Sequence, residues 1–204
     1  LDQYASTIDM KKVKIYNLSD FPDHPDTIYL TVRDKNGMVI SFINSLFDAF
    51  GSGITAPKSG VLFHCRGRAF NTIEGHPNEL NPNKRPVHTI IPAMISKNNK
   101  NMGSFGVMGG QYQANGHARI LSNIKDYGME FQEALNFPRS FYFDGILSLE
   151  KGYPSIIKEK LCEIGYKIEE ATIPIGGAQL VRIDSSGVLI GASDPRKDGC
   201  ALGI

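Results

Sequence analysis

Residues 26–32 read Asp-Thr-Ile-Tyr-Leu-Thr-Val, and a segment with the sequence Arg-Asp-Lys-Asn-Gly follows at 33–37. Over 27–32 every second side chain is apolar and most are β-branched or aromatic, which is typical of a strand with one buried face. The Asp-Lys-Asn-Gly segment has the composition of a turn. These residues predict the first strand of a hairpin, with Thr27 at the start of that strand. Taken alone, they indicate only an ordinary edge-strand threonine.

The remainder of the chain predicts strands, then helices, then strands. The segment at 38–43 is nearly all apolar, so we expect it to form a central, buried strand. Residues 66–86 are polar and rich in Pro, Asn and Gly, so we expect a long loop there, a feature that is usually functional or disordered. The predicted strands lie at 27–32, 38–44, 61–65, 90–95, 104–108, 179–183 and 188–192.

Three helices are predicted in the second half of the chain. After a glycine pair at 109–110, residues from Ala118 onward recur at helical intervals until Gly128. A short helix is expected at 130–136, because a proline follows closely. Another is expected between a proline at 154, which suits a helix start, and a glycine at 165, which suits a helix end. Pattern alone therefore predicts an α+β layered fold.

Composition limits the kinds of protein this chain can be. It has 204 residues, of which 41% are hydrophobic and 21% charged, which suits one globular domain or a large piece of one. The net charge is +1 and the basic residues are dispersed, so we expect no nucleic-acid partner. No apolar run approaches the ~18 residues that span a bilayer. Because the chain begins with Leu1, we expect a fragment or a processed product, and the compartment stays open.

Cysteines and histidines give no metal or disulfide pattern. The three cysteines, Cys65, Cys162 and Cys200, lie far apart, and an odd number without C-x-x-C spacing argues against a disulfide framework or a zinc site. We therefore expect free or packed thiols, no metal and no cofactor. The five histidines, which show no paired ligand spacing, are His24, His64, His76, His88 and His117.

An ordered set of short motifs carries a stronger signal than any one of them. Together with the first hairpin, they closely resemble the catalytic small subunit of the γ-glutamyltransferase (γ-glutamyltranspeptidase) family, from Thr27 to about Arg196. In chain order the motifs are 34–37 (Asp-Lys-Asn-Gly), 50–54 (Phe-Gly-Ser-Gly-Ile), 59–62 (Ser-Gly-Val-Leu), 82–86 (Pro-Asn-Lys-Arg-Pro), 109–110 (Gly-Gly), 126–129 (Asp-Tyr-Gly-Met), 134–139 (Ala-Leu-Asn-Phe-Pro-Arg) and 191–196 (Gly-Ala-Ser-Asp-Pro-Arg).

The resemblance implies a particular fold and a cut in the chain. The fold would be the N-terminal-nucleophile hydrolase αββα sandwich, of which this chain supplies about half and a large subunit from the same precursor supplies the rest. Self-cleavage would fall between Asp26 and Thr27. Residues 1–26 would then be an upstream segment ending at the cleaved bond, and residues 27–204 the catalytic small-subunit domain. Because 20–26 holds two prolines and three acids, we expect a loop there, which would also suit a plain linker.

The resemblance makes Thr27 the nucleophile, and chemistry explains why it must become a chain terminus. A hydroxyl is a poor nucleophile until a base removes its proton, and a terminal threonine carries that base in its own α-amine. The amine has a reference pKa of roughly 7.7–8.0, near working pH. Cleavage after Asp26 would therefore create the base as well as expose the nucleophile.

Two further positions have implied catalytic roles. Ser45 stands where the family usually has a second threonine that hydrogen-bonds the nucleophile, although a strand-end serine making a local backbone bond is an equal alternative. Gly109 and Gly110 match the family's glycine pair that forms an oxyanion hole. Adjacent glycines before a helix let backbone N–H groups approach developing negative charge. Without the resemblance, a tight turn would be the better interpretation.

The donor pocket departs from the family pattern. The acid that holds the donor's α-amino group aligns with Ala69, and an asparagine of the same site aligns with Phe47. The serine pair that holds the α-carboxylate aligns with His88 and Thr89, which we retain as substrate-binding candidates.

Arg66 and Arg68 are the other substrate-binding candidates. Two arginines suit a carboxylate, so an acyl group such as glutaryl, which has a carboxylate but no amine, would fit them. Solvated loop arginines are an equal alternative.

We expect a self-processing N-terminal threonine amidohydrolase of the γ-glutamyltransferase family. It would cleave small γ-glutamyl amides such as glutathione through an acyl-enzyme, by hydrolysis or by transfer to an acceptor. One alternative is an acylase for glutaryl-type or other carboxylate-bearing amides. Another is an uncleaved, non-catalytic relative, against which the retained Thr27, Ser45 and glycine pair argue. The sequence leaves the acceptor and any higher oligomer open.

Overall fold

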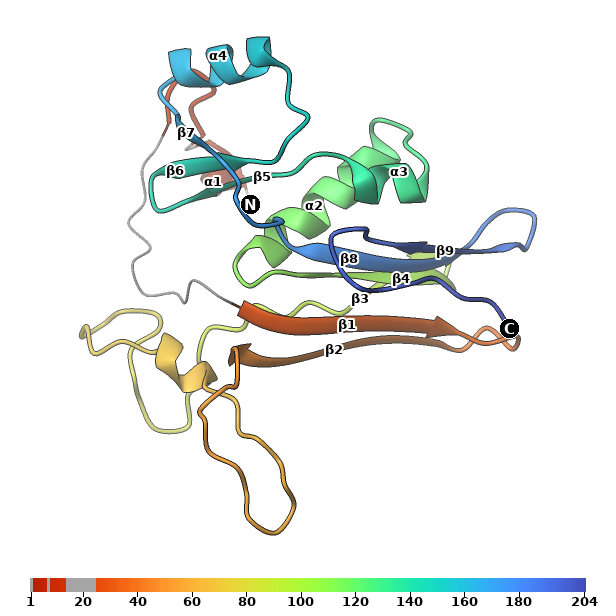
Figure 1. The fold of residues 1–204 in the computed structure, drawn as a ribbon, viewed down its shortest axis with the longest axis horizontal. Helices are drawn as coiled ribbons and strands as arrows, with labels where there is room; N and C mark the ends of the chain where they lie inside the picture. Colours follow the sequence, from red (N-terminus) through yellow and green to blue (C-terminus); the bar gives the residue numbers. More distant parts are fainter. Residues whose placement is uncertain (1, 7, 14–24) are drawn as a thin grey trace. The chain divides into compact units, whose positions relative to one another are not determined.

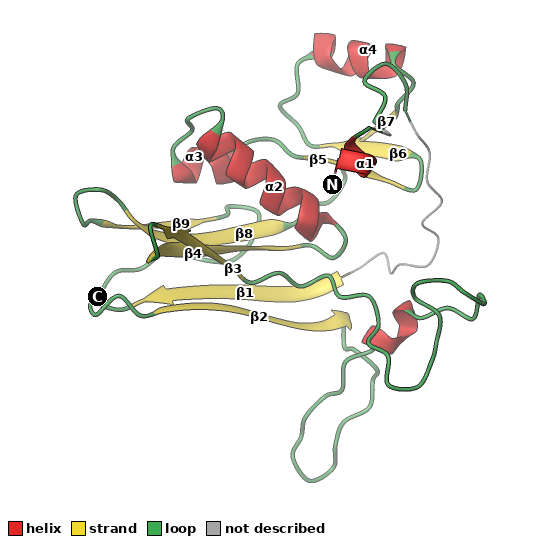
Figure 2. Ribbon diagram, turned by 180° about the vertical axis from the view of Figure 1, so that it is seen from behind, coloured by secondary structure: helices red, strands yellow, loops and turns green. Residues whose placement is uncertain are grey.

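The computed structural model describes residues 2–6, 8–13 and 25–204 (Figures 1 and 2). Internal contacts divide the chain into two compact units. Unit 1 combines Leu1–Ser19 with Pro138–Ile175, and unit 2 combines Asp20–Phe137 with Gly176–Ile204.

The hairpin predicted from the opening stretch is present in unit 2. Strand β1 (Pro25–Arg33) pairs antiparallel with β2 (Val39–Asp48). The turn between them is held by the carboxylate of Asp34, which accepts from the backbone N–H groups of Asn36 (2.9 Å) and Met38 (2.8 Å). The strand begins two residues before Thr27, so the predicted loop is wrong at 25–26, where backbone pairing with β2 extends the strand. Residues 20–24 of that loop lie outside the described residues.

A four-stranded antiparallel sheet forms the centre of unit 2. Its order is β3-β4-β8-β9, and its hairpins β3–β4 and β8–β9 confirm the two predicted strand pairs in these regions. Residues 103–108 of β4 are all buried, because β4 has a strand on each side and packed layers above and below. The bounds are β3 Ala93–Lys97, β4 Lys100–Met108, β8 Gly177–Ile183 and β9 Leu189–Ser193.

Two helices cover one face of this sheet and the β1–β2 hairpin covers the other (Figures 1 and 2). Helix α2 (Tyr112–Lys125) begins earlier than the spacing from residue 118 predicts, whereas α3 (Phe131–Asn136) lies within its predicted range. The fully buried side chains of Val107, Ile120 and Leu135 form the core between helices and sheet. Unit 2 therefore has three layers, in the order helix, sheet, sheet.

Unit 1 contains a small three-stranded sheet that the sequence analysis missed. Strands β5 and β6 pair antiparallel, and β6 pairs parallel with β7 after a crossover through the predicted helix α4. Each of these strands has four residues, too few to show a periodic pattern. The bounds are α1 Asp2–Ala5, β5 Ser140–Phe143, β6 Ile146–Leu149, α4 Ser155–Glu163 and β7 Lys167–Glu170.

Two strand predictions are wrong. The segment at 61–65 makes only an isolated bridge between Leu62 and Thr55, so no strand forms there. The apolar strand β2 is not central in this chain, since it belongs to a two-stranded sheet. The predicted loop at 66–86 is largely present, with a short 3-10 helix, η1 (Arg66–Ala69), at its start.

The second face of β2 and β1 is apolar and open in the described part of the chain. We define the outer hairpin face as Ile28, Leu30, Val32, Ile40 and Phe42, whose side chains are 43–59% exposed. They alternate with the residues that face the four-stranded sheet, as the period of a strand requires. A contiguous apolar patch of this kind marks a contact surface. We expect further chain from the same precursor to cover it.

Leu30 and Phe42 lie opposite each other on this face, so they test its role. Changing both to Lys should make isolated residues 27–204 more soluble but prevent their assembly with the rest of the full-length protein. Light scattering after size-exclusion chromatography measures both effects. The matched control changes Val188 and Leu189 to Lys, because these exposed apolar residues lie at the β8–β9 turn and not on the outer hairpin face. A monodisperse, cooperatively melting wild-type 27–204 fragment would contradict the expectation.

Candidate active site

The hairpin register brings the predicted nucleophile and its predicted partner together. Thr27 pairs with Ser45 across β1 and β2, and the Thr27 Oγ1 hydroxyl donates to Ser45 Oγ at 3.0 Å. Ser45 Oγ also accepts from the backbone N–H of Phe47 at 3.1 Å. The Ser45 hydroxyl is therefore oriented by the backbone on one side and holds the threonine hydroxyl on the other.

A β-bulge lies beside the Asp26–Thr27 peptide bond. Asp26 pairs with Phe47 whereas Thr27 pairs with Ser45, which leaves Leu46 as the extra residue of β2. Phe47 has a φ of +80°, a left-handed conformation that costs a bulky residue on the order of 1–2 kcal/mol. The buried Phe47 ring holds this conformation in place. Bulges of this kind re-aim side chains next to reactive sites.

Side chains on the inner face of β1 contact successive residues of β4. As β1 is traced back toward its start, the contacts on β4 move toward Met108. Burial raises the pKa of the Tyr29 phenol, which stays neutral and hydrogen-bonds Ser41 Oγ at 2.7 Å. The contacts are Arg33 Nη1 donating to the Asn101 carbonyl (3.2 Å), Thr31 Oγ1 bonded to Ser104 Oγ, and the Tyr29 ring against Gly106, where an added Cβ would lie 2.4 Å from the ring.

This progression places the start of β1 at the same end of the layers as the β4–α2 junction, and both views show them there (Figures 1 and 2). The junction is Gly109-Gly110, with φ values of +131° and +57°. A Cβ on Gly109 would lie 2.7 Å from the Gly176 Cα, so only glycine fits. The carbonyl of Gly109 accepts from the Tyr112 N–H at 3.1 Å, which turns the chain into α2.

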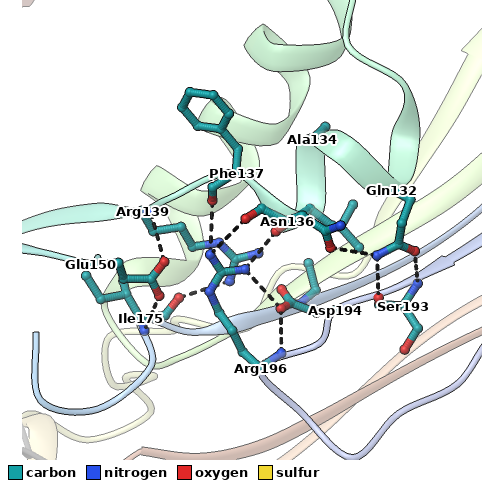
Figure 3. Close-up of polar contacts among 12 residues, drawn as sticks. Gln132, Ala134, Asn136, Phe137, Arg139, Glu150, Ile175, Ser193, Asp194 and Arg196 are labelled. Carbon is teal, nitrogen blue, oxygen red and sulfur yellow. Dashed lines mark hydrogen bonds and ion pairs between the residues drawn. The ribbon is translucent and has the colours of Figure 1, made fainter. Parts of the chain in front are cut away.

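A buried ion pair supports this junction from β8 and β9 (Figure 3). Asp194, with no exposed surface, accepts from the Ala178 N–H at 2.9 Å and from Arg196 Nη1 at 3.2 Å. The Arg196 guanidinium donates to the carbonyls of Leu135 (2.8 Å) and Phe137 (3.0 Å) at the end of α3. The pair thus joins α3 to the first residues of β8, beside the glycine that contacts Gly109.

Asp194 and Arg196 belong to the 191–196 motif that carries the resemblance, but the sequence analysis assigned neither of them a role. Figure 3 also shows the Glu150 carboxylate of unit 1, which accepts from the backbone N–H groups of Arg139 (2.9 Å) and Ile175 (3.0 Å).

Arg66 is the most buried of the four predicted substrate-binding residues. Only 5% of its surface is exposed, and its guanidinium carbon lies 5.0 Å from the centroid of the Phe47 ring. Nη1 donates to Thr89 Oγ1 at 3.2 Å, whereas Nη2 is buried and has no hydrogen-bond partner among the described residues. Burial lowers the pKa of Arg66 from its ordinary value, although an arginine remains charged.

The other candidates take different positions. Arg68 is exposed and forms an ion pair with Asp48 at 2.6 Å, and His88 is also exposed. The structure therefore joins Arg66 to Thr89 but not to Arg68. Gln113 of α2 was missed by the sequence analysis. With its amide oriented to satisfy both groups, it donates to the carbonyls of Thr89 (2.8 Å) and Val107 (3.1 Å).

Other kinds of site find no support in the described part of the chain. No group of three or more His, Cys, Asp or Glu side chains there could hold a metal ion, and no helix described is long and apolar enough to cross a membrane. Cys65, Cys162 and Cys200 are free thiols.

Comparisons with known proteins agree on one family. The family model described as Gamma-glutamyltranspeptidase matches residues 1–204. The Glutathione hydrolase-like YwrD proenzyme of Bacillus subtilis (strain 168) is 36% identical over 193 residues, 90% of this chain and 37% of that protein. The Oxamate amidohydrolase proenzyme of Klebsiella pneumoniae is 32% identical over 187 residues, 87% of this chain and 35% of that protein.

A solved structure supports the same grouping. The cephalosporin acylase from Bacillus halodurans superposes with a TM-score of 0.85 at 34% identity, covering 98% of this chain and 38% of that chain. The mixed α/β architecture is thus shared with hydrolases of the N-terminal-nucleophile type, as expected. The chain belongs to the γ-glutamyltranspeptidase family, which confirms the resemblance seen in its motifs. It spans a little over a third of the length of these relatives.

The Asp194–Arg196 pair can be tested by stability. In full-length protein, Asp194→Ala removes the carboxylate that pairs with the Arg196 guanidinium and accepts from the Ala178 N–H, a kind of loss that typically costs about 3–5 kcal/mol. Urea unfolding should show this decrease in the free energy of unfolding. Asp184→Ala is the matched control, because Asp184 caps the exposed β8–β9 turn and should matter much less. Equal effects of the two substitutions would contradict a structural role for the buried pair.

Proposed function

We propose that the chain carries the nucleophile of a self-processing N-terminal threonine amidohydrolase that cleaves γ-glutamyl amides such as glutathione. The observation that carries this proposal is the Thr27–Ser45 hydroxyl pair at 3.0 Å, beside an Asp26–Thr27 peptide that lies opposite a β-bulge, in a chain of this family. A large subunit from the same precursor would complete the enzyme.

Self-cleavage would begin with the Thr27 hydroxyl. Its oxygen attacks the Asp26 carbonyl carbon, the C–N bond breaks, and the hydroxyl proton ends on the departing nitrogen. The product is an ester between Asp26 and the Thr27 side chain. Water then hydrolyses the ester, which leaves a carboxylate on Asp26 and a free α-amine on Thr27. Phe47, directly opposite Asp26, has a strained backbone, and strain of this kind clusters at reactive sites.

The same hydroxyl would act on substrate after cleavage. The new α-amine removes the Thr27 hydroxyl proton, and the oxygen attacks the substrate amide carbon. The amine of the substrate then leaves and takes up that proton. Ser45 positions the hydroxyl throughout, because its own oxygen is fixed by the Phe47 N–H. The resulting acyl ester is resolved by water or by an acceptor amine.

Gly109 and Gly110 are proposed to stabilise the oxyanion formed in each attack. Their positive φ values and their position before the first turn of α2 suit backbone N–H donors that approach closely. A helix start also favours negative charge. Any side chain at Gly109 would displace the junction, since it would collide with Gly176.

A second candidate is an acylase for carboxylate-bearing amides such as glutaryl amides. The observation that favours it is Ala69, which is 1% exposed and apolar at the position where the resemblance places an acid for the donor's amine. The names of two relatives, an oxamate amidohydrolase and a cephalosporin acylase, support amide hydrolysis of more than one kind.

The nucleophile is tested by intact mass of full-length protein. The wild type should separate between Asp26 and Thr27 without added protease, and Thr27→Ala should stay whole. Ser45→Ala should slow both cleavage and turnover, whereas Ser45→Thr should be tolerated because only the hydroxyl is needed. Cutting of the Thr27→Ala variant at the same bond would assign the cut to another protease, and an uncut wild type would favour a non-catalytic relative.

The two candidate functions differ in the donor they prefer. If γ-glutamyl transfer is the function, γ-glutamyl p-nitroanilide should be the faster donor and glycylglycine should raise its rate. If acylase activity is the function, glutaryl p-nitroanilide should be hydrolysed at least as fast and glycylglycine should have little effect. Initial rates of nitroaniline release measure both. Thr27→Ala protein is the blank.

A further inference from the structure

We propose that Arg66 binds a carboxylate on the acyl group of the substrate, so that the enzyme selects amides of dicarboxylic acids. This inference rests on the proposed function, because it concerns the acyl group that Thr27 would accept. The sequence left recognition of the carboxylate to Arg66 and Arg68 together, whereas this inference assigns it to Arg66 alone.

The burial of Arg66 is the first argument. Arg66 is 95% buried as a residue and its Nη2 is buried, and a buried charge is stable only when it is paired or fully hydrogen-bonded. Nη1 has the Thr89 hydroxyl, but no carboxylate pairs with Arg66 among the described residues, and its Nη2 has no acceptor there. The site is therefore built for an anion that arrives from outside these residues.

The position of Arg66 relative to the nucleophile is the second argument. Thr27 Oγ1 bonds Ser45 Oγ at 3.0 Å, Ser45 Oγ bonds the Phe47 N–H at 3.1 Å, and the Phe47 ring carries the guanidinium at 5.0 Å. Thr27 and Arg66 are thus joined by three consecutive contacts through Ser45 and Phe47. An acyl group of a few carbons, esterified to Thr27, would reach from Thr27 toward Arg66.

The rigidity of the guanidinium is the third argument. Its face is fixed by the Phe47 ring and one edge by Thr89, whose own carbonyl is held by the Gln113 amide at 2.8 Å. Nη2 is the buried nitrogen of this guanidinium that has no acceptor among the described residues. A planar, preoriented guanidinium edge is the group that best matches a carboxylate. Arg68 is not equivalent, since its charge is paired with Asp48 at the surface.

The test compares two anilides that differ by the terminal carboxylate. Glutaryl p-nitroanilide carries the terminal carboxylate, and butyryl p-nitroanilide lacks it. In full-length Arg66→Met protein, kcat/KM for the glutaryl compound should fall ~10–100-fold, the usual value of a charge-assisted hydrogen bond, whereas the butyryl rate should stay within about threefold. Succinyl and adipyl anilides show which acyl length Arg66 recognises.

Arg119→Met is the matched control, because the Arg119 guanidinium also lies over a phenylalanine ring, Phe137, at 5.4 Å, but on α2. It should leave the glutaryl-to-butyryl ratio unchanged. Intact mass should show that both variants still separate before Thr27, so that a loss of processing is distinguished from a loss of recognition. An equal fall for both anilides in Arg66→Met protein would assign Arg66 to packing and overturn the proposal.

A binding measurement tests the proposal without turnover. Calorimetric titration of full-length Thr27→Ala protein with glutarate should give binding that Arg66→Met weakens ~10–100-fold and Arg119→Met does not change. Glutarate binding that is equal in both variants would overturn the proposal even if neither anilide is hydrolysed. Absence of hydrolysis together with Arg66-dependent glutarate binding would contradict the proposed function instead and support the carboxylate site.

Discussion

The antiparallel register that sets Thr27 opposite Ser45 is the constraint on which the site depends. A shift of one residue would turn Thr27 to the outer hairpin face and bring Ile28 inward. The bulge at Leu46 lets β1 continue past Thr27 while keeping this pairing, so the peptide bond before Thr27 remains part of a strand and not of a free loop. The same bulge places the Phe47 ring beneath Arg66, which links the position of the proposed nucleophile to the proposed acyl site.

The four-stranded sheet behind the hairpin holds the Gly109-Gly110 junction, the other half of the candidate site, through close approach of backbones. Gly106 admits the Tyr29 ring, and Gly109 lies against Gly176, so β1, β4 and β8 approach more closely than side chains would allow. The buried Asp194–Arg196 pair joins β8 to the end of α3 and limits movement of this arrangement. Backbone N–H donors stabilise developing negative charge best when they need not move during the reaction. A glycine junction held from both sides suits the oxyanion hole proposed for it.

Much of unit 2 could be predicted from local patterns. The alternation at 27–32, the Asp34 turn and the helical spacing before Gly128 reflect forces that act within a few residues. Three features could not be predicted. The four-residue strands of unit 1 are too short for a period, β2 has an apolar sequence although its outer face is open in this chain, and the segment at 61–65 has strand-like residues but forms only an isolated bridge. The burial of Arg66 and the Asp194–Arg196 pair depend on contacts between distant segments, which sequence spacing does not report.

The central claim, that the Thr27 hydroxyl is the nucleophile of turnover, is tested most directly by trapping the acyl-enzyme. Full-length protein is mixed with an excess of glutaryl or γ-glutamyl p-nitroanilide, quenched in acid within the first turnover, digested and analysed by mass spectrometry. The account predicts one added acyl group, released by hydroxylamine, on the peptide that begins with Thr27 and on the side-chain oxygen of that residue. An acyl group on any other residue, or steady turnover with no acylated Thr27 peptide at any time, would contradict it.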